Sequence, residues 1–190
     1  MPQPDQTDQT VLTIMFQHHT WATQALLDAC AALSAEQIAA TATGAYGSIQ
    51  DTLHHLVGAE VSYVHRVTGQ WPDPSLGMTR HEFPGVAVLR EVAGWTGAQL
   101  LQLALTARAG DRVREYSDDR TVVVDYRLAS LLMQAIDHAT EHRTHVATIL
   151  TQLGLEPPDM AGWKWMEDTG DFREYANPDL PAAPPAAPLA

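Results

Sequence analysis

The sequence predicts an all-α protein that folds as a four-helix bundle. Four long stretches carry apolar residues three to four positions apart, which is the spacing of a helix. Segments rich in glycine and proline separate these stretches. Residues that favour strands gather in one short segment before the last helix. Long helices with almost no strand bury their apolar faces best against one another, and the result is a bundle.

We predict the first helix over residues 10–33. Its apolar positions are Val11, Ile14, Met15, Trp21, Ala25 and Leu26. Ser34, followed three residues later by Gln37, is typical of a capping box, so a short helical turn should begin there.

Ser48 is the expected N-cap of the second helix, and Gly69 is its expected end. The apolar stripe between them is Ile49, Leu53, Leu56, Val57, Val64 and Val67. Residues 70–85 contain three prolines and two glycines and predict a loop. The third helix is expected over residues 86–107, where Gly94 and Gly97 weaken the helix but permit close packing.

A long crossover, with a small hairpin as one form of it, is expected before the fourth helix. Residues 121–124 favour strands and residues 117–119 favour a turn. The fourth helix is predicted over residues 127–153, because Gly154 follows it directly. Its apolar face is Leu128, Leu131, Leu132, Ala135, Ala139, Val146, Ile149, Leu150 and Leu153.

The 190 residues predict one bundle domain over residues 1–160 and a C-terminal extension over residues 161–190. Aromatic side chains of this extension could dock onto the body: Trp163, Trp165, Phe172 and Tyr175. From residue 177 onward the composition of proline and alanine predicts a disordered tail.

Charge and composition exclude several classes of partner. A net charge of −12 repels phosphate backbones and anionic lipid, so we expect no nucleic acid and no membrane as partners. Cys30 is the one cysteine, which fits a reducing compartment. Residues 1–10 lack the features of a signal peptide, and we expect a soluble, cytoplasmic protein.

The nine histidines indicate where chemistry would occur. His138 and His142 are four positions apart on the fourth helix, so both rings can reach one ion. Two core histidines with separate hydrogen-bond partners would give the same pattern. On the second helix, His54 and His55 flank the apolar stripe on opposite sides. Periodicity does not choose between them, although small neighbours leave more room at His55.

Three stretches of the chain resemble the DinB-like family, also called DinB/YfiT-like. They are residues 47–60, 138–143 and 152–158, and the resemblance extends over residues 10–159. It implies a four-helix bundle in which three histidines bind a divalent metal, zinc or nickel. On this basis the metal ligands are His55, His138 and His142. The resemblance fails at Thr144 and His145, and His145 could be a rim residue, a partner of a ligand or a fourth ligand.

The resemblance also implies a metalloenzyme, most directly one that transfers a low-molecular-weight thiol to an electrophile. The metal would then hold the thiol, and the small-molecule substrate would be the partner. Cys30 is a poor nucleophile because it has no basic neighbour in sequence. We expect Arg143 to form a salt bridge with a nearby acid, or else to bind a substrate carboxylate. Imidazole ligands predict that metal affinity drops between about pH 7 and pH 5.

Two other functions remain open. Residues 138–142 also spell H-x-x-E-H, the motif of a metal-dependent hydrolase or peptidase with Glu141 as general base. Its third ligand would have to be Glu156, Glu167 or Glu174, all of which lie in the C-terminal region. Alternatively, the bundle binds a metal or ligand without catalysis, as a stress-response protein. Each of these functions is compatible with a homodimer.

Overall fold

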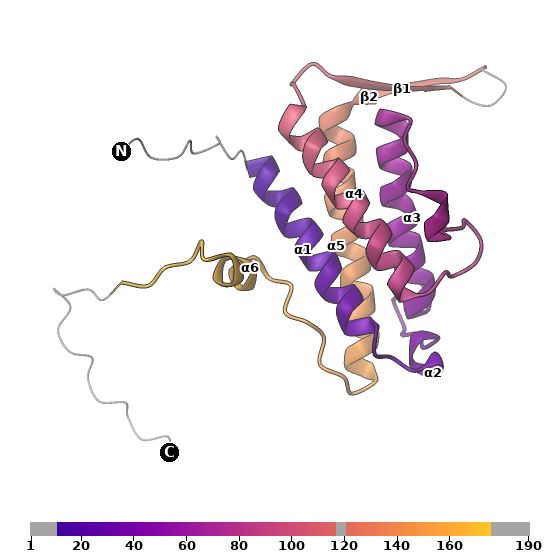
Figure 1. Cartoon of the computed structure of the whole chain (residues 1–190), viewed down its shortest axis with the longest axis vertical. Helices are drawn as coiled ribbons and strands as arrows, with labels where there is room; N and C mark the ends of the chain where they lie inside the picture. The colour runs from indigo at the N-terminus through magenta and orange to yellow at the C-terminus, as the bar shows by residue number, and fades with distance from the viewer. Residues whose placement is uncertain (1–10, 117–120, 176–190) are drawn as a thin grey trace.

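The computed structural model describes residues 11–116 and 121–175. Four long helices form the predicted bundle (Figure 1): α1 (Val11–Cys30), α3 (Ile49–Thr68), α4 (Val86–Thr106) and α5 (Leu128–Gln152). Each lies within a few residues of its predicted bounds. The predicted turn at residues 117–119 and the predicted disordered tail from residue 177 lie outside the described residues.

The helices follow the order α1, α4, α3, α5 around the bundle, because α1 and α3 each pack against both α4 and α5. The ends of α3 and α4 and the start of α5 lie at one end of the molecule (Figure 1). There Arg66 of α3 pairs with Glu115, and the amide of Leu128 donates to the carbonyl of Asp111. α3 and α4 therefore run in the same direction.

The segment between α3 and α4 accordingly returns along the bundle. It contains one 3-10 turn, η1 (Pro74–Leu76). The carbonyl of Thr79 lies 2.7 Å from Nε2 of His54, and the side chain of Met78 lies beside Gly58. Both contacts place the returning segment against the first half of α3.

The expected hairpin is present before α5. Strands β1 (Arg112–Tyr116) and β2 (Val123–Arg127) pair antiparallel, with Val113 opposite Tyr126. The second strand begins two residues later than the strand-favouring sequence and continues directly into α5. Asp125 pairs with both Arg112 and Arg114, which ties the two strands together on their exposed side.

Local sequence signals set the helix ends as predicted. Ser34 forms a capping box with Gln37 and opens the one-turn helix α2 (Ala35–Ile38). Ser48 does the same with Asp51 at the start of α3. Gly69 ends α3 with a φ of 72°, in the left-handed region where a side chain would be strained.

The predicted apolar stripe of α1 is right at Leu26, which is buried, and wrong at Val11 and Met15, which are exposed. Val11 is 75% exposed and Met15 is 43% exposed, whereas the buried face of the helix contains Phe16, Leu26 and Cys30. The buried face also carries three polar residues, Thr13, His19 and Thr23. An apolar periodicity cannot locate a face on which buried polar side chains replace apolar ones.

Two of these polar residues, His19 and Thr23, belong to a buried polar cluster with members on all four long helices. It consists of His19 and Thr23 on α1, Glu60 on α3, Thr96 on α4 and Arg143 on α5, each at most 4% exposed. Thr96 Oγ1 donates to Glu60 Oε2 over 2.6 Å, and His19 Nε2 lies 3.0 Å from Glu60 Oε1. A buried carboxylate is tolerated only with such partners, so this cluster fixes how the helices face one another.

The short helix α6 (Gly162–Thr169), which the sequence did not predict, lies beside α1 (Figure 1). Trp165 is 8% exposed and meets the ring of His18 edge-on, and Nε2 of His18 lies 2.9 Å from the carbonyl of Met160. Trp163 and Tyr175 remain largely exposed, so of the aromatic residues expected to dock, Trp165 is the one most buried. Within the described part of the chain, every helix is too short or too polar to cross a membrane.

Candidate metal centre

The fold brings His55, His138 and His142 together. His55 comes from the first half of α3, and the other two come from one face of α5, which packs against α3. Nε2 of His138 lies 3.0 Å from Nε2 of His55 and 3.1 Å from Nε2 of His142. All three ligand atoms fall within 4.8 Å of one another. His142 is buried, and the other two are partly buried.

This geometry fits a shared cation better than a set of hydrogen bonds. A neutral ring nitrogen carries either a proton or a lone pair, so Nε2 of His138 cannot serve both of its short contacts fully. Ligands at 2.0–2.1 Å from a tetrahedral zinc ion stand about 3.3 Å apart. The observed 3.0 and 3.1 Å are close to that spacing. The donor set therefore suits one divalent ion.

The protein keeps these rings neutral. Burial, followed by the positive charge that His138, His55 and His145 would carry, lowers the pKa of His142 to about 4. Burial and then His54 lower the pKa of His55, and burial and then His55 lower the pKa of His138. Neutral imidazole is the form that binds metal, so no ligand has to lose a proton at neutral pH.

Two tyrosines border the three rings. Tyr46, from the loop before α3, stacks on His55 with ring centroids 4.4 Å apart and planes 20° apart. The same ring meets His142 edge-on at 4.9 Å. Tyr63 of α3 meets His138 edge-on at 6.0 Å. Each of the three candidate ligands is therefore in contact with the ring of a tyrosine.

The two remaining histidines near the cluster do not join it. His54 turns away, and its Nε2 approaches the carbonyl of Thr79. Nδ1 of His145 lies 3.4 Å from Nδ1 of His142, the nitrogen on the far side of that ring from the cluster. His145 is thus a neighbour of a candidate ligand. Nδ1 of His138 is buried without a hydrogen-bond partner among the residues that the structure describes.

The H-x-x-E-H arrangement does not form a site in this structure. Glu141 is exposed, and the third residue of the cluster is His55, not a glutamate. The candidate third ligands Glu156, Glu167 and Glu174 are all exposed on the C-terminal segment.

Arg143 does not form the salt bridge that was expected for it with any acid that the structure describes. The residue is 4% exposed, and its guanidinium donates to the hydroxyls of Thr23 and Thr140, each over 3.0 Å. Within the described residues no carboxylate lies at salt-bridge distance from it. Burial lowers its pKa to about 10, while the charge of Glu60 acts in the opposite direction. Arg143 thus belongs to the buried polar cluster and links α5 to α1.

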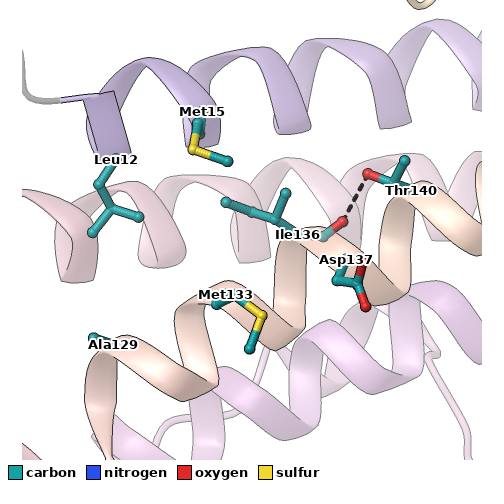
Figure 2. Close-up of a pocket in the computed structure, with 7 residues that line it drawn as sticks. All are labelled: Leu12, Met15, Ala129, Met133, Ile136, Asp137 and Thr140. Carbon is teal, nitrogen blue, oxygen red and sulfur yellow. Dashed lines mark hydrogen bonds between the residues drawn. The ribbon is translucent and has the colours of Figure 1, made fainter.

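An apolar groove of about 350 Å³ lies elsewhere, between the first halves of α1 and α5 (Figure 2). Met15 projects into it from α1, and Met133 and Ile136 from α5. The full lining is Leu12, Met15, Ala129, Met133, Ile136, Asp137 and Thr140, which includes no histidine. The groove is therefore separate from the candidate metal centre. The homodimer that the sequence left open stays a prediction.

The sequence did not single out three residues that the structure shows to be important: Tyr46 beside the centre, and His19 and Glu60 in the buried polar cluster. Glu60 follows Leu56 and Val57 by four and three positions, which places it on the core stripe of α3. A carboxylate in that stripe signals a buried partner, and His19 is that partner. Tyr46 lies in a glycine-rich loop, where no periodicity predicts the direction of a side chain.

Comparisons with known proteins agree with the fold. The solved structure of YfiT from Bacillus subtilis, described as a probable metal-dependent hydrolase with an unusual four-helix bundle topology, is similar to this chain. The two chains are 17% identical, the match covers 82% of this chain and 94% of YfiT, and the TM-score is 0.50. A search of curated proteins finds no match. The model of the DinB family matches residues 3–174, and the chain therefore belongs to the DinB family.

Proposed function

We propose that this protein is a metal-dependent enzyme that activates a small thiol or water at one divalent ion held by His55, His138 and His142. The convergence of the three Nε2 atoms carries this proposal. Three imidazoles are neutral, borderline ligands that suit zinc or nickel, and both remain candidates. Three protein ligands leave one coordination position open for an exogenous molecule.

A divalent ion in this position would lower the pKa of a thiol or water and so supply a nucleophile at neutral pH. Our leading assignment is S-transfer from a low-molecular-weight thiol. The thiol gives up its proton to solvent and its sulfur forms a bond to an electrophilic carbon. In a substitution the bond from that carbon to the leaving group breaks and the leaving group departs with the electron pair; in an addition the π bond at that carbon breaks and the displaced pair takes up a proton from solvent. The three histidines would orient the thiol, and they need no proton transfer of their own.

The surroundings of the cluster favour a thiol over water. Cys30 is 1% exposed and burial raises its pKa to about 12, so the protein offers no thiolate of its own. No carboxylate joins the cluster within the described residues, and Glu141 is exposed. Water attack gains more from a nearby general base than an already ionised thiol does.

Hydrolysis is the second candidate. The similar YfiT is described as a probable metal-dependent hydrolase, and a three-histidine ion with an open position also suits water. Such a hydrolase would not use the H-x-x-E-H ligand set, because the third residue of the cluster is His55 and Glu141 is exposed. The third candidate is a stress-response protein that binds a metal or ligand without turnover.

The net charge of −12 supports a small-molecule partner and disfavours nucleic acid and anionic membrane. The single buried cysteine supports a reducing compartment, and we include a cytoplasmic location in the proposal.

One sample tests these assignments together. Protein purified without chelator should carry about one zinc or nickel per chain by elemental analysis. The loaded protein is then assayed with a panel of thiols and electrophiles, and in parallel with ester, amide and phosphate substrates without thiol. Thiol-dependent turnover that His55→Gln abolishes supports the transferase, and thiol-independent turnover supports the hydrolase. Metal without turnover would leave a binding protein, and the absence of metal in every preparation would refute the metal centre.

A further inference from the structure

The loop between α2 and α3, residues 39–48, presents one aromatic ring to the candidate ligands. Its base is closed by a bridge between Thr41 and Ser48 and by a hydrogen bond from the amide of Ile49 to the carbonyl of Ala40. The turn within it needs Gly44, whose φ of 85° lies in the left-handed region. The loop is thus anchored to the first turn of α3, the helix that carries His55.

Tyr46 contacts a candidate ligand from each of two helices. Its ring lies flat on His55 of α3 and meets His142 of α5 edge-on. Both are favourable arrangements of aromatic rings. Because Tyr46 is 53% exposed, burial alone does not account for its position. The contacts with the two imidazoles are the specific interactions of this side chain.

His55 is the candidate ligand that most needs such support. His138 and His142 are held in mutual register by one helix, four positions apart. His55 reaches them from another helix, so no local register aligns its ring with theirs, and its partly buried side chain must be kept from rotating. A ring stacked on His55 restricts that rotation and keeps Nε2 directed at His138. Partners that orient a ligand in this way commonly change metal affinity 10–100-fold when they are removed.

We propose that Tyr46 is a positioning residue of the metal centre, which holds His55 in the ligating orientation by stacking on its ring. This inference rests on the proposed three-histidine metal site. The aromatic ring carries the effect, and the hydroxyl is not required. A phenylalanine at position 46 should therefore preserve metal affinity, whereas leucine or alanine at the same position should weaken it.

Cobalt(II) is the probe, because it reports both affinity and ligand geometry through its visible absorption. Relative to the parent, Tyr46→Ala and Tyr46→Leu should weaken Co²⁺ binding at least about tenfold and alter the Co²⁺ absorption band. Tyr46→Phe should keep the affinity within about twofold and preserve the band.

The chain offers a matched control outside the centre. Trp71 stacks on His65 with centroids 4.0 Å apart and planes 24° apart, an arrangement like that of Tyr46 on His55. Trp71→Ala should leave Co²⁺ affinity and absorption unchanged. Circular dichroism of every variant identifies any loss of fold, and Tyr46→Leu serves if Tyr46→Ala does not fold.

The possible failures are distinguishable. Parent protein that binds no Co²⁺ would refute the metal site itself, and this inference with it. A parent that binds Co²⁺, together with alanine and leucine variants of equal affinity and spectrum, would refute the role of Tyr46 alone. The same role is refuted if Tyr46→Phe loses as much affinity as Tyr46→Ala, because stacking would then not be the cause.

Discussion

Nε2 of His55 lies 3.0 Å from Nε2 of His138, although the two residues are 83 positions apart and belong to different helices. α3 and α5 are neighbours in the bundle, so their facing side chains meet. His54, the adjacent residue, points instead toward the segment that returns along α3. One position along the helix turns a side chain by about 100° and thereby separates a candidate ligand from a bystander.

The pair of adjacent histidines gives a direct test of the ligand set. His55→Gln should reduce the metal content of the purified protein from about one ion per chain to nearly none. His54→Gln, its control, should leave the content unchanged because His54 faces Thr79. Elemental analysis of the two proteins, prepared side by side, measures this. Equal metal content in both would show that His55 is not a ligand.

In mild acid the protein should keep more of its metal affinity than a site of three imidazoles with ordinary pKa values would keep. The pKa values of all three rings are lowered, that of His142 to about 4, so the ligands stay neutral below the ordinary value of 6.5. The loss of affinity that the sequence predicted between pH 7 and pH 5 should therefore begin at a lower pH than three ordinary imidazoles would give. Chelator competition across this range measures it. Three imidazoles with the ordinary pKa of 6.5 would lose about thirtyfold in affinity between pH 7 and pH 6, and a loss that large would contradict the lowered values.

The stability of the metal-free protein should depend on pH through the same ring. In the unfolded chain His142 takes up a proton near pH 6.5, whereas in the folded chain it does so near pH 4. The unfolded state thus binds more protons between these values, and the free energy of unfolding should decrease as pH falls from 6.5 to 4. Denaturant titrations at several pH values measure this slope. His142→Asn should flatten it, and an unchanged slope in that variant would assign the effect to other groups.

Glu60 should contribute strongly to stability. Glu60→Ala leaves Thr96 and His19 without their buried partner, and we expect the free energy of unfolding to fall by about 3 kcal/mol. Arg90→Ala is the control, because its pair with Asp28 is half exposed and should contribute less than about 1 kcal/mol. Urea denaturation compares the two. Equal losses would mean that the buried polar cluster does not stabilise the bundle.

Two glycines of α4 should respond oppositely to alanine. A Cβ at Gly97 would lie 2.5 Å from Oγ1 of Thr20, so Gly97→Ala should lower the free energy of unfolding by about 1–3 kcal/mol. At Gly94 the nearest atom would be 3.6 Å away, and alanine should raise stability by up to about 1 kcal/mol through helix propensity. Thermal unfolding of both variants tests this. A stabilised Gly97→Ala protein would show that α1 and α4 are not in close contact there.

Helix ends and the core faces of α3 and α5 were predictable because their signals are local. Ser48, Asp51 and Gly69 specify the start and end of α3 through hydrogen bonds and a backbone angle that depend on neighbours in sequence. The apolar faces of α3 and α5 have a clear period, and all but Val67 and Leu153 of the predicted stripe residues are buried. In α1 the prediction was right at Leu26 but wrong at Val11 and Met15, because buried polar residues interrupt the apolar period.

By itself, then, the sequence determined the four long helices, most of their bounds and the shared face of His138 and His142, since each depends on interactions within a few residues. Only the tertiary structure decided that Tyr46 lies on His55, that Glu60 meets His19, and that Arg143 bonds to threonines instead of a carboxylate. These contacts join residues from different elements. Their geometry follows from how whole helices and loops pack, which no local pattern encodes.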